Sequence, residues 1–207
     1  MAHDRRFDPT KLAKLDSAER RARMPPVAVA LALELGSRSR VADIGAGTGY
    51  VTFAMLDANV PPETIHAIDV SAAMLEELTR RAAEHPRGAA VRTYVAPAEG
   101  LPLGAASVDR VVLGNVFHEL DDAGRALLEA RRVLAPGGRL VIFDWERPHG
   151  AHGAADIGPP YEHRVARRDV ESALRAAGFE DVRSHEGFRD VYALSARSGA
   201  LVSASRN

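Results

Sequence analysis

The sequence predicts an α/β fold in which a mostly parallel, doubly wound sheet of seven strands carries helices on both faces. Short apolar runs alternate with helical patterns along most of the chain, and this alternation is typical of parallel sheets flanked by helices. The last two apolar runs are joined by the short connection E-G-F-R-D. Such a connection demands an antiparallel pair, because a parallel return needs a longer crossover.

The apolar runs give the expected strands. They lie at residues 41–44, 64–69, 90–95, 108–113, 139–144, 179–186 and 191–196. Ahead of them, helical spacing predicts one helix over residues 10–23, which a Pro-Pro pair ends, and a second helix over residues 27–35. We therefore divide the single domain into an N-terminal helical lid segment, residues 1–36, and a core, residues 37–207.

A long connection after the fifth expected strand is a second lid candidate. Residues 145–168 contain glycines, prolines and histidines, and loops of this length in compact domains are usually functional. Ligands of doubly wound sheets bind at the carboxyl ends of the strands, the edge from which this connection leaves. Trp145 either walls an acceptor pocket or belongs to the core, and residues 161–164 either recognise the acceptor or form a solvated loop. The histidine spacing matches no metal template, so no metal is expected.

A glycine-rich turn follows the first expected strand. The stretch V-A-D-I-G-A-G-T-G-Y places Gly45, Gly47 and Gly49 between that strand and a helix that begins at Tyr50. Glycine lets the backbone turn tightly and approach a ligand, and the N–H groups at a helix start favour polar or anionic groups. Dinucleotide sites read G-x-G-x-x-G, whereas Tyr50 stands at the third glycine position here, and no P-loop lysine follows. The turn therefore predicts a cofactor site but disfavours both kinds of phosphate site.

Further stretches complete a pattern around this turn. The second expected strand ends in Asp69, A-P-A-E-G-L-P-L follows the third, G-N-V-F-H-E-L-D-D follows the fourth, and P-G-G precedes the fifth. Together they resemble the class I S-adenosylmethionine-dependent methyltransferases, in particular the methyltransferase type 11 and ubiquinone/menaquinone-biosynthesis-like subset of small bacterial proteins. The resemblance covers roughly residues 39–194. It implies a Rossmann-like strand order of 3-2-1-4-5-7-6 with the last strand antiparallel, S-adenosyl-L-methionine as cofactor and S-adenosyl-L-homocysteine as product.

The resemblance also assigns roles to individual residues. Asp43 would lie at the methionine end of the cofactor, and Asp69 would accept the ribose hydroxyls, for which a carboxylate offers two oxygens. Where many relatives carry an adenine-binding aspartate, this chain has Pro97, so adenine contacts would come from Ala98, Glu99 or elsewhere. The expected cofactor-binding residues are Asp43, Gly45, Gly47, Gly49, Tyr50, Asp69, Val70, Met74, Ala98, Glu99 and Asn115.

Three residues are candidates for the chemistry of methyl transfer: His118, Glu119 and Asp144. His118 and Glu119 follow the fourth expected strand, near the expected methyl group, and the unperturbed pKa of histidine lies near neutrality, which suits a general base. Alternatively, His118 caps the crevice through backbone hydrogen bonds and Glu119 starts a helix. Asp144 either binds an amine or hydroxyl of the acceptor or caps the loop. A base is optional, because a neutral amine can attack first and lose its proton later.

Composition narrows the choice of partners. The 207 residues carry a formal net charge of −1, which leaves no broad basic surface for nucleic acid, and the lack of cysteine excludes disulfides and thiolate chemistry. No apolar run approaches the roughly 20 residues that span a membrane, and the first residues lack the apolar stretch of a signal peptide. We therefore expect a cytoplasmic protein with a small-molecule acceptor, no nucleic acid and no stable membrane insertion. A homodimer is compatible with the sequence.

The pattern as a whole favours an S-adenosylmethionine-dependent methyltransferase that acts on a small molecule by in-line displacement. One alternative is the same chemistry on a lipid headgroup or a quinone precursor. Another is a non-catalytic, S-adenosylmethionine-binding regulatory protein of the same fold, which the missing adenine aspartate motivates. A dinucleotide oxidoreductase is a third hypothesis, which Tyr50 disfavours.

Overall fold

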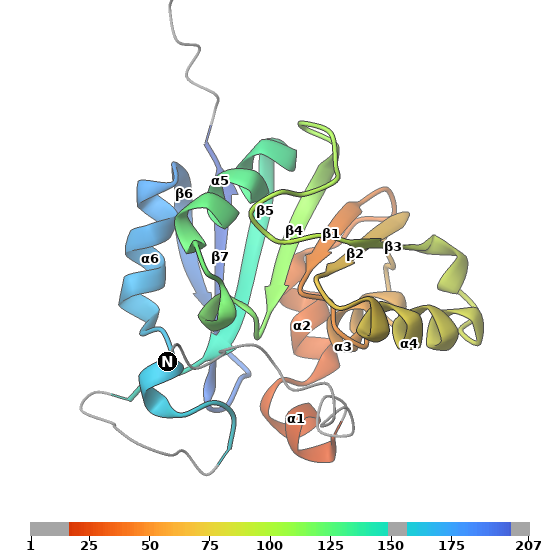
Figure 1. The fold of residues 1–207 in the computed structure, drawn as a ribbon, viewed down its shortest axis with the longest axis horizontal. Helices are drawn as coiled ribbons and strands as arrows, with labels where there is room; N and C mark the ends of the chain where they lie inside the picture. The colour runs from red at the N-terminus through yellow and green to blue at the C-terminus, as the bar shows by residue number, and fades with distance from the viewer. Residues whose placement is uncertain (1–16, 149–156, 200–207) are drawn as a thin grey trace, which may run out of the picture.

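The computed structural model describes residues 17–148 and 157–199 and contains one sheet of seven strands (Figure 1). The strands are β1 Arg40–Ile44, β2 Thr64–Asp69, β3 Val91–Val95, β4 Val108–Gly114, β5 Leu134–Trp145, β6 Phe179–His185 and β7 Val191–Ser198. Their order across the sheet is β3-β2-β1-β4-β5-β7-β6. Neighbours from β3 to β5 run parallel, whereas β7 runs antiparallel to both β5 and β6. The predicted fold class and strand order are confirmed.

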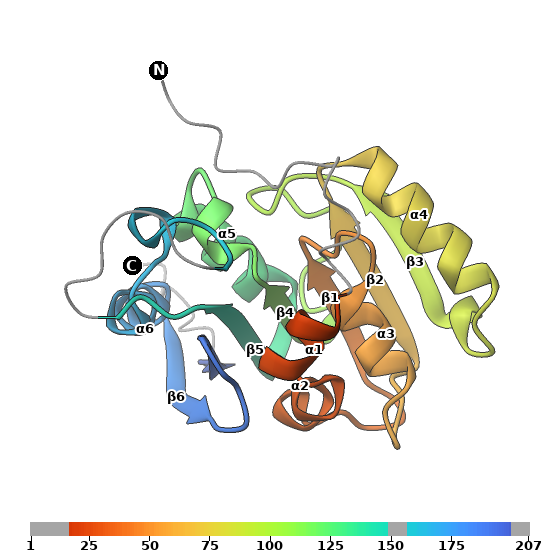
Figure 2. The same cartoon turned by 90° about the horizontal axis from the view of Figure 1, so that it is seen from below.

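Helices cover both faces of this sheet (Figure 2). The α-helices are α1 Ala18–Arg23, α2 Pro26–Leu33, α3 Tyr50–Leu56, α4 Ala72–Ala83, α5 Ala123–Val133 and α6 Arg167–Ala176, and short 3-10 turns are η2 Gly88–Ala90, η3 Phe117–Glu119 and η4 Tyr161–His163. Buried apolar side chains of α2, α3 and α4 pack on one face, and those of α5 and α6, such as Leu127 and Leu174, pack on the other. The strands supply both cores by alternation: Phe143 of β5 faces α2 and α3, while its neighbour Ile142 faces the other cluster.

The fifth strand begins earlier than the sequence predicts. β5 starts at Leu134 rather than at residue 139, because Leu134 already pairs with Val108 of β4. The register between the two strands then shifts before Arg110, and Gly137 takes a positive φ of 74°. The Pro-Gly-Gly stretch, expected to precede the fifth strand, is therefore an irregular part of that strand.

The N-terminal helices also differ in detail from the prediction. Only α1 of the expected first helix belongs to the described residues, and residues 10–16 lie outside them. Pro26 opens α2, which is favourable because the first turn of a helix leaves its N–H groups unbonded in any case. α2 ends at Leu33 because Glu34 takes a left-handed φ of 47°.

None of the described helices has the length and apolar character needed to cross a membrane.

The functional edge of the sheet is set by the parallel strands. β1 pairs with β2 and β4, and β4 pairs with β5, all in the same direction, so their carboxyl ends meet at one edge. The glycine turn leaves β1 there, residues 115–119 leave β4, and the connection toward α6 leaves β5. Segments far apart in the sequence are therefore brought together where ligands of doubly wound sheets bind.

Adjacent leucines of α5 provide a matched test of this packing. Leu127 is fully buried in the core, whereas Leu128 is 56 % exposed. We expect Leu127→Ala to lower the free energy of unfolding by roughly 2–5 kcal/mol, because it removes buried methyl groups and leaves a cavity. Leu128→Ala should change that free energy by less than about 0.5 kcal/mol. Urea denaturation measures both, and equal losses would contradict the described orientation of α5.

Candidate functional site

The three glycines between β1 and α3 are needed for different structural reasons. All have positive φ, a conformation in which other residues are strained. A Cβ on Gly45 would lie 2.5 Å from Val116, and a Cβ on Gly49 would lie 2.7 Å from an aromatic ring. A Cβ on Gly47 would meet only the sulfur of Met74, at 4.0 Å. Gly45 and Gly49 thus permit close packing, while Gly47 leaves space at the turn that a ligand can occupy.

Asp69 holds this turn against the end of β2. Its Oδ2 accepts a hydrogen bond from the N–H of Gly47 at 2.8 Å, and its Oδ1 accepts one from the N–H of Ser71 at 2.8 Å. Each carboxylate oxygen can still accept a second hydrogen bond. The arrangement is compatible with the binding of ribose hydroxyls, a role that stays a prediction.

Asp43, at the end of β1, is buried and only partly satisfied. Its Oδ2 accepts a hydrogen bond from the hydroxyl of Thr52 at 2.6 Å, while its buried Oδ1 has no partner. Burial raises the pKa of Asp43 to about 6, the hydrogen bond from Thr52 opposes this increase, and the charge of Asp69 adds to it. No sequence pattern marks Thr52, which is a fully buried polar residue of α3. A cationic donor at Oδ1 would satisfy the carboxylate.

A second buried acceptor lies at the end of the neighbouring strand β4. Asn115 has a positive φ of 59°, and its N–H donates to the carbonyl of Phe143 at 2.7 Å. The side-chain Oδ1 of Asn115 is buried without a partner. Since β1 and β4 are adjacent, the ends of both strands offer a buried oxygen that lacks a donor. Such oxygens suit the amino group of an amino acid, which has three hydrogens to donate.

The residues expected around adenine differ in exposure. Val70 is 51 % exposed, whereas Met74 and Ala98 are buried. The carboxylate of Glu99 accepts a hydrogen bond from the N–H of Asp122 at 3.3 Å, which ties the loop after β3 to the start of α5. The structure brings these residues to the carboxyl edge, and their contacts with adenine stay predictions.

Tyr50 connects the glycine turn to the N-terminal segment. Its hydroxyl donates to the carbonyl of Met24 at 2.6 Å, and the guanidinium of Arg20 lies 4.3 Å from the centre of its ring. The side chain of Arg23 forms an ion pair with Asp190 at 3.0 Å, in the turn between β6 and β7. α1 is therefore fixed at the rim of the site from two sides.

His118 and Asp144 form a buried pair across the ends of β4 and β5. The Nδ1 of His118 lies 2.7 Å from Oδ1 of Asp144, and the backbone N–H of His118 donates to Oδ2 at 2.9 Å. Oδ1 also accepts a hydrogen bond from the N–H of Trp145 at 2.7 Å. Since both oxygens of Asp144 already accept backbone N–H groups, Nδ1 is placed to donate to Oδ1, and in this tautomer of the neutral imidazole the lone pair is on Nε2.

The carboxylates around His118 change its basicity. Burial by itself lowers the pKa of His118, but the charge of Asp144 and its hydrogen bond outweigh burial and raise the pKa above its ordinary value. Glu119 contributes in the same direction, and its Oε1 lies 3.6 Å from Nε2 of His118. Asp144 itself is fully buried behind the imidazole. The contacts of Asp144 are with the protein, so they favour an effect exerted through His118 over direct binding of the acceptor.

The described end of the connection after β5 packs on Trp145. The guanidinium of Arg164 donates to the carbonyls of Pro159 and Glu146 at 3.0 Å each, and it also bonds the carbonyl of Ile157. It lies 5.2 Å from the ring of Trp145 and 4.6 Å from the ring of Tyr161. The structure thus joins Trp145 to Tyr161 and Arg164, and the role of this connection as a lid stays a prediction. Residues 149–156, which include the remaining histidines of this connection, lie outside the described residues.

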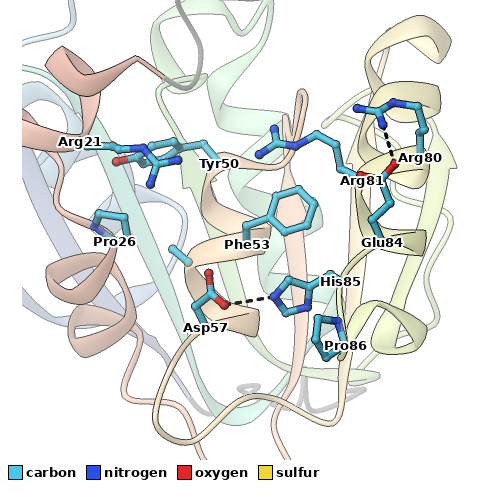
Figure 3. A pocket seen from close by; sticks show the side chains of 11 residues that line it. Arg21, Pro26, Tyr50, Phe53, Asp57, Arg80, Arg81, Glu84, His85 and Pro86 are labelled. Atoms are coloured by element: carbon cyan, nitrogen blue, oxygen red, sulfur yellow. Dashed lines mark hydrogen bonds and ion pairs between the residues drawn. The ribbon is translucent and has the colours of Figure 1, made fainter.

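A separate groove of about 410 Å³ lies among α1, α3 and α4 (Figure 3). Nε2 of His85 lies within hydrogen-bonding distance of Oδ1 of Asp57 there, at 3.1 Å, and Arg80 forms an ion pair with Glu84 at 2.8 Å. Of the expected site residues, Tyr50 alone lines this groove. The groove lies in the helical layer, and the residues expected to carry the chemistry lie at the edge of the sheet.

Comparison with known proteins agrees with this geometry. Residues 42–142 match a protein family described as "Methyltransferase domain". A solved S-adenosylmethionine-dependent methyltransferase from Aquifex aeolicus superposes with a TM-score of 0.80 and 26% identity, covering 93% of this chain and 99% of that protein.

Curated relatives carry several names. "Malonyl-[acyl-carrier protein] O-methyltransferase" of Methylococcus capsulatus is 32% identical over 79% of this chain and 62% of its own length. "Demethylmenaquinone methyltransferase" of Thermus thermophilus is 39% identical over 61% of this chain and 56% of its own length. "Uncharacterized methyltransferase YdaC" of Bacillus subtilis is 32% identical over 69% of this chain and 72% of its own length. The chain thus spans 62% and 56% of the first two relatives.

Substitution of Gly47 tests the space at the glycine turn. We expect Gly47→Val to abolish measurable binding of S-adenosylhomocysteine in calorimetry, because the branched side chain fills the space that faces Met74. Gly137→Val is the matched control, since Gly137 also has a positive φ, of 74°, and a Cβ there meets nothing within 4 Å. The control should bind like the wild type despite similar backbone strain. Retained binding by Gly47→Val would show that the ligand lies elsewhere.

The partly satisfied carboxylate predicts a pH dependence of ligand binding. Because the pKa of Asp43 is about 6, the affinity for S-adenosylhomocysteine should fall as the pH drops below that value, by at most about tenfold per pH unit. The sign follows from the charge: the protonated carboxyl no longer attracts an ammonium group. Asp43→Asn should bind more weakly and lose this dependence. Calorimetry between about pH 5 and pH 8 measures both, and a flat wild-type profile would remove Asp43 from the ammonium site.

Proposed function

Because the chain belongs to the family of S-adenosylmethionine-dependent methyltransferases, we propose that it transfers a methyl group from S-adenosylmethionine to a small-molecule acceptor. One observation carries the proposal: a turn with open space at Gly47 lies at the same sheet edge as the buried His118–Asp144 pair. The first feature suits a cofactor, and the second suits removal of a proton from an acceptor.

The residues present fit this cofactor at its polar end. The unpaired oxygens of Asp43 and Asn115 would receive the ammonium group of its methionine part, and Asp69 would receive the ribose hydroxyls. Gly47 would let the backbone approach the ligand. When bound, the cofactor supplies an electrophilic methyl group on a sulfonium.

His118 would act on the acceptor. Its Nε2 lone pair would take the proton of an acceptor hydroxyl while the acceptor oxygen forms its bond to the methyl group. The cofactor would supply the methyl group and keep the electron pair of its carbon–sulfur bond as a neutral thioether. Asp144 would keep the imidazole in the required tautomer and stabilise the imidazolium that forms.

The acceptor class is also part of the proposal. The net charge of −1 supports a small molecule rather than nucleic acid. A quinone precursor or lipid headgroup is the main alternative, and the name of the Thermus thermophilus relative supports the quinone precursor. We also propose that residues 1–36 and 145–168 form a lid over the acceptor. The anchoring of α1 by Tyr50 and of residues 157–164 by Arg164 supports this role.

A non-catalytic regulatory role is the second candidate, and Pro97 favours it because proline offers neither an N–H nor a side-chain acceptor to adenine. Calorimetry with S-adenosylmethionine, S-adenosylhomocysteine and NADH, followed by an acceptor screen, separates the candidates. We expect micromolar binding of the first two ligands, no binding of NADH, and turnover. Binding without turnover on any acceptor would favour the regulatory role, and preferential binding of NADH would contradict both.

The pH profile of turnover tests His118. Because a base must be unprotonated, kcat should rise with pH through a midpoint above 6.5, the ordinary pKa of histidine. His118→Gln should lower kcat by roughly 10²–10⁴-fold without changing the dissociation constant of S-adenosylhomocysteine. Asp144→Asn should lower kcat and move the midpoint to lower pH, because it removes the charge that raises the pKa of His118. A wild-type midpoint that Asp144→Asn leaves unchanged would exclude His118 as the titrating group.

A further inference from the structure

A buried tyrosine beside the His118–Asp144 pair has an unsatisfied hydroxyl. Tyr192 of β7 lies directly opposite Asp144 of β5, so both side chains stand on the same face of the sheet. Tyr192 is 5 % exposed, and its hydroxyl is buried without a hydrogen-bond partner. A buried hydroxyl in this state costs free energy unless a ligand or an internal water satisfies it. No sequence pattern marks this residue, because it stands in an apolar run.

The surroundings of this hydroxyl define what it can bind. Burial, and then the charges of Asp144, Glu146 and Asp169, raise the pKa of Tyr192 above its ordinary value, so the phenol stays protonated and remains a donor. Glu146 follows β5, and Asp169 lies in the first turn of α6. The hydroxyl therefore belongs to the edge of the sheet from which the connection after β5 leaves.

The neighbouring groups do not use this donor. Asp144 already receives two N–H groups of His118 and the N–H of Trp145. The carbonyl of Glu146 accepts a hydrogen bond from Arg164. The hydroxyl of Tyr192 is a donor beside oxygens that already accept hydrogen bonds, and it lies opposite Asp144, which holds His118 in place. It is therefore suited to donate to an oxygen of the bound methyl acceptor.

We infer that the hydroxyl of Tyr192 donates a hydrogen bond to a second oxygen of the acceptor, distinct from the oxygen that His118 deprotonates. This inference rests on the proposed function. Donation to the reacting oxygen itself would lower its nucleophilicity, whereas donation to another oxygen orients the molecule at no such cost. The acceptor class is therefore a molecule with a second oxygen besides the one that is methylated, such as a catechol or a quinol, and Tyr192 is a specificity-determining residue.

Matched acceptors and a conservative variant test this inference. The probes are catechol with phenol and 1,4-dihydroxynaphthalene with 1-naphthol, in which the second member of each pair lacks one oxygen. The wild type should methylate the dihydroxy member with a KM at least about tenfold lower, and Tyr192→Phe should reduce that preference to about twofold or less. The binding of S-adenosylhomocysteine and the melting temperature should not fall, because Phe removes a hydroxyl that has no partner.

Tyr94→Phe is the control for loss of a phenol. Tyr94 lies on β3, at the edge of the sheet far from β7, and its hydroxyl is 3.3 Å from Nδ1 of His66. This variant should keep the wild-type preference for the dihydroxy acceptors.

Three results would overturn the inference while leaving the proposed function intact. The first is a Tyr192→Phe variant that keeps the full preference. The second is binding of S-adenosylhomocysteine without methylation of any member of either pair. The third is a lower melting temperature of Tyr192→Phe with unchanged kinetics, which would assign the hydroxyl to an internal water. Failure of the wild type to bind S-adenosylhomocysteine would instead contradict the proposed function, and the inference would fall with it.

Discussion

Two buried carboxylates at the carboxyl edge of the sheet organise the site, and the fold satisfies them to different degrees. A buried charge is tolerated where donors surround it. Asp144 receives three N–H groups, so it is fixed in place and its charge acts on the imidazole of His118. Asp43 receives one hydroxyl, from Thr52, and keeps a buried oxygen without a donor. The first carboxylate supports another side chain, and the second suits a cationic ligand.

The segments around this edge are tied together through the turn between β6 and β7. The N–H of Glu146, just after β5, donates to the carbonyl of Asp190 at 3.0 Å, and the side chain of Asp190 pairs with Arg23 of α1. Arg164 binds the carbonyl of Glu146 from the other side. α1, the end of β5 and the described end of the following connection therefore share one anchoring point. The described parts of the two proposed lid segments are therefore held together by hydrogen bonds and one ion pair.

The sequence predicts the sheet well because its signals are local. Each strand is an apolar run, and the short connection before β7 settles its direction. The early start of β5 depends on the pairing of Leu134 with Val108, which no local pattern records. The site residues also fall into two groups. The glycine turn and the acids at strand ends can be recognised in the sequence. The placement of Asp144 behind His118, and of Tyr192 opposite Asp144, depends on pairing between strands that are far apart along the chain.

The unpaired oxygen of Asp43 also links ligand binding to folding. The pKa of Asp43 is about 6 in the folded protein and 3.8 in its unperturbed state, so between these values the folded state holds a proton that the unfolded state lacks. The corresponding stability is fully present below the lower value and is lost as the pH rises through the higher one. Near neutral pH the folded protein therefore carries a buried charge at a cost to its stability. An ammonium group at Oδ1 would offset that cost, and donors or acceptors from a ligand would do the same for Asn115 and Tyr192. The edge of the sheet thus departs from complete hydrogen bonding at the residues proposed to bind cofactor and acceptor, as expected where function competes with stability.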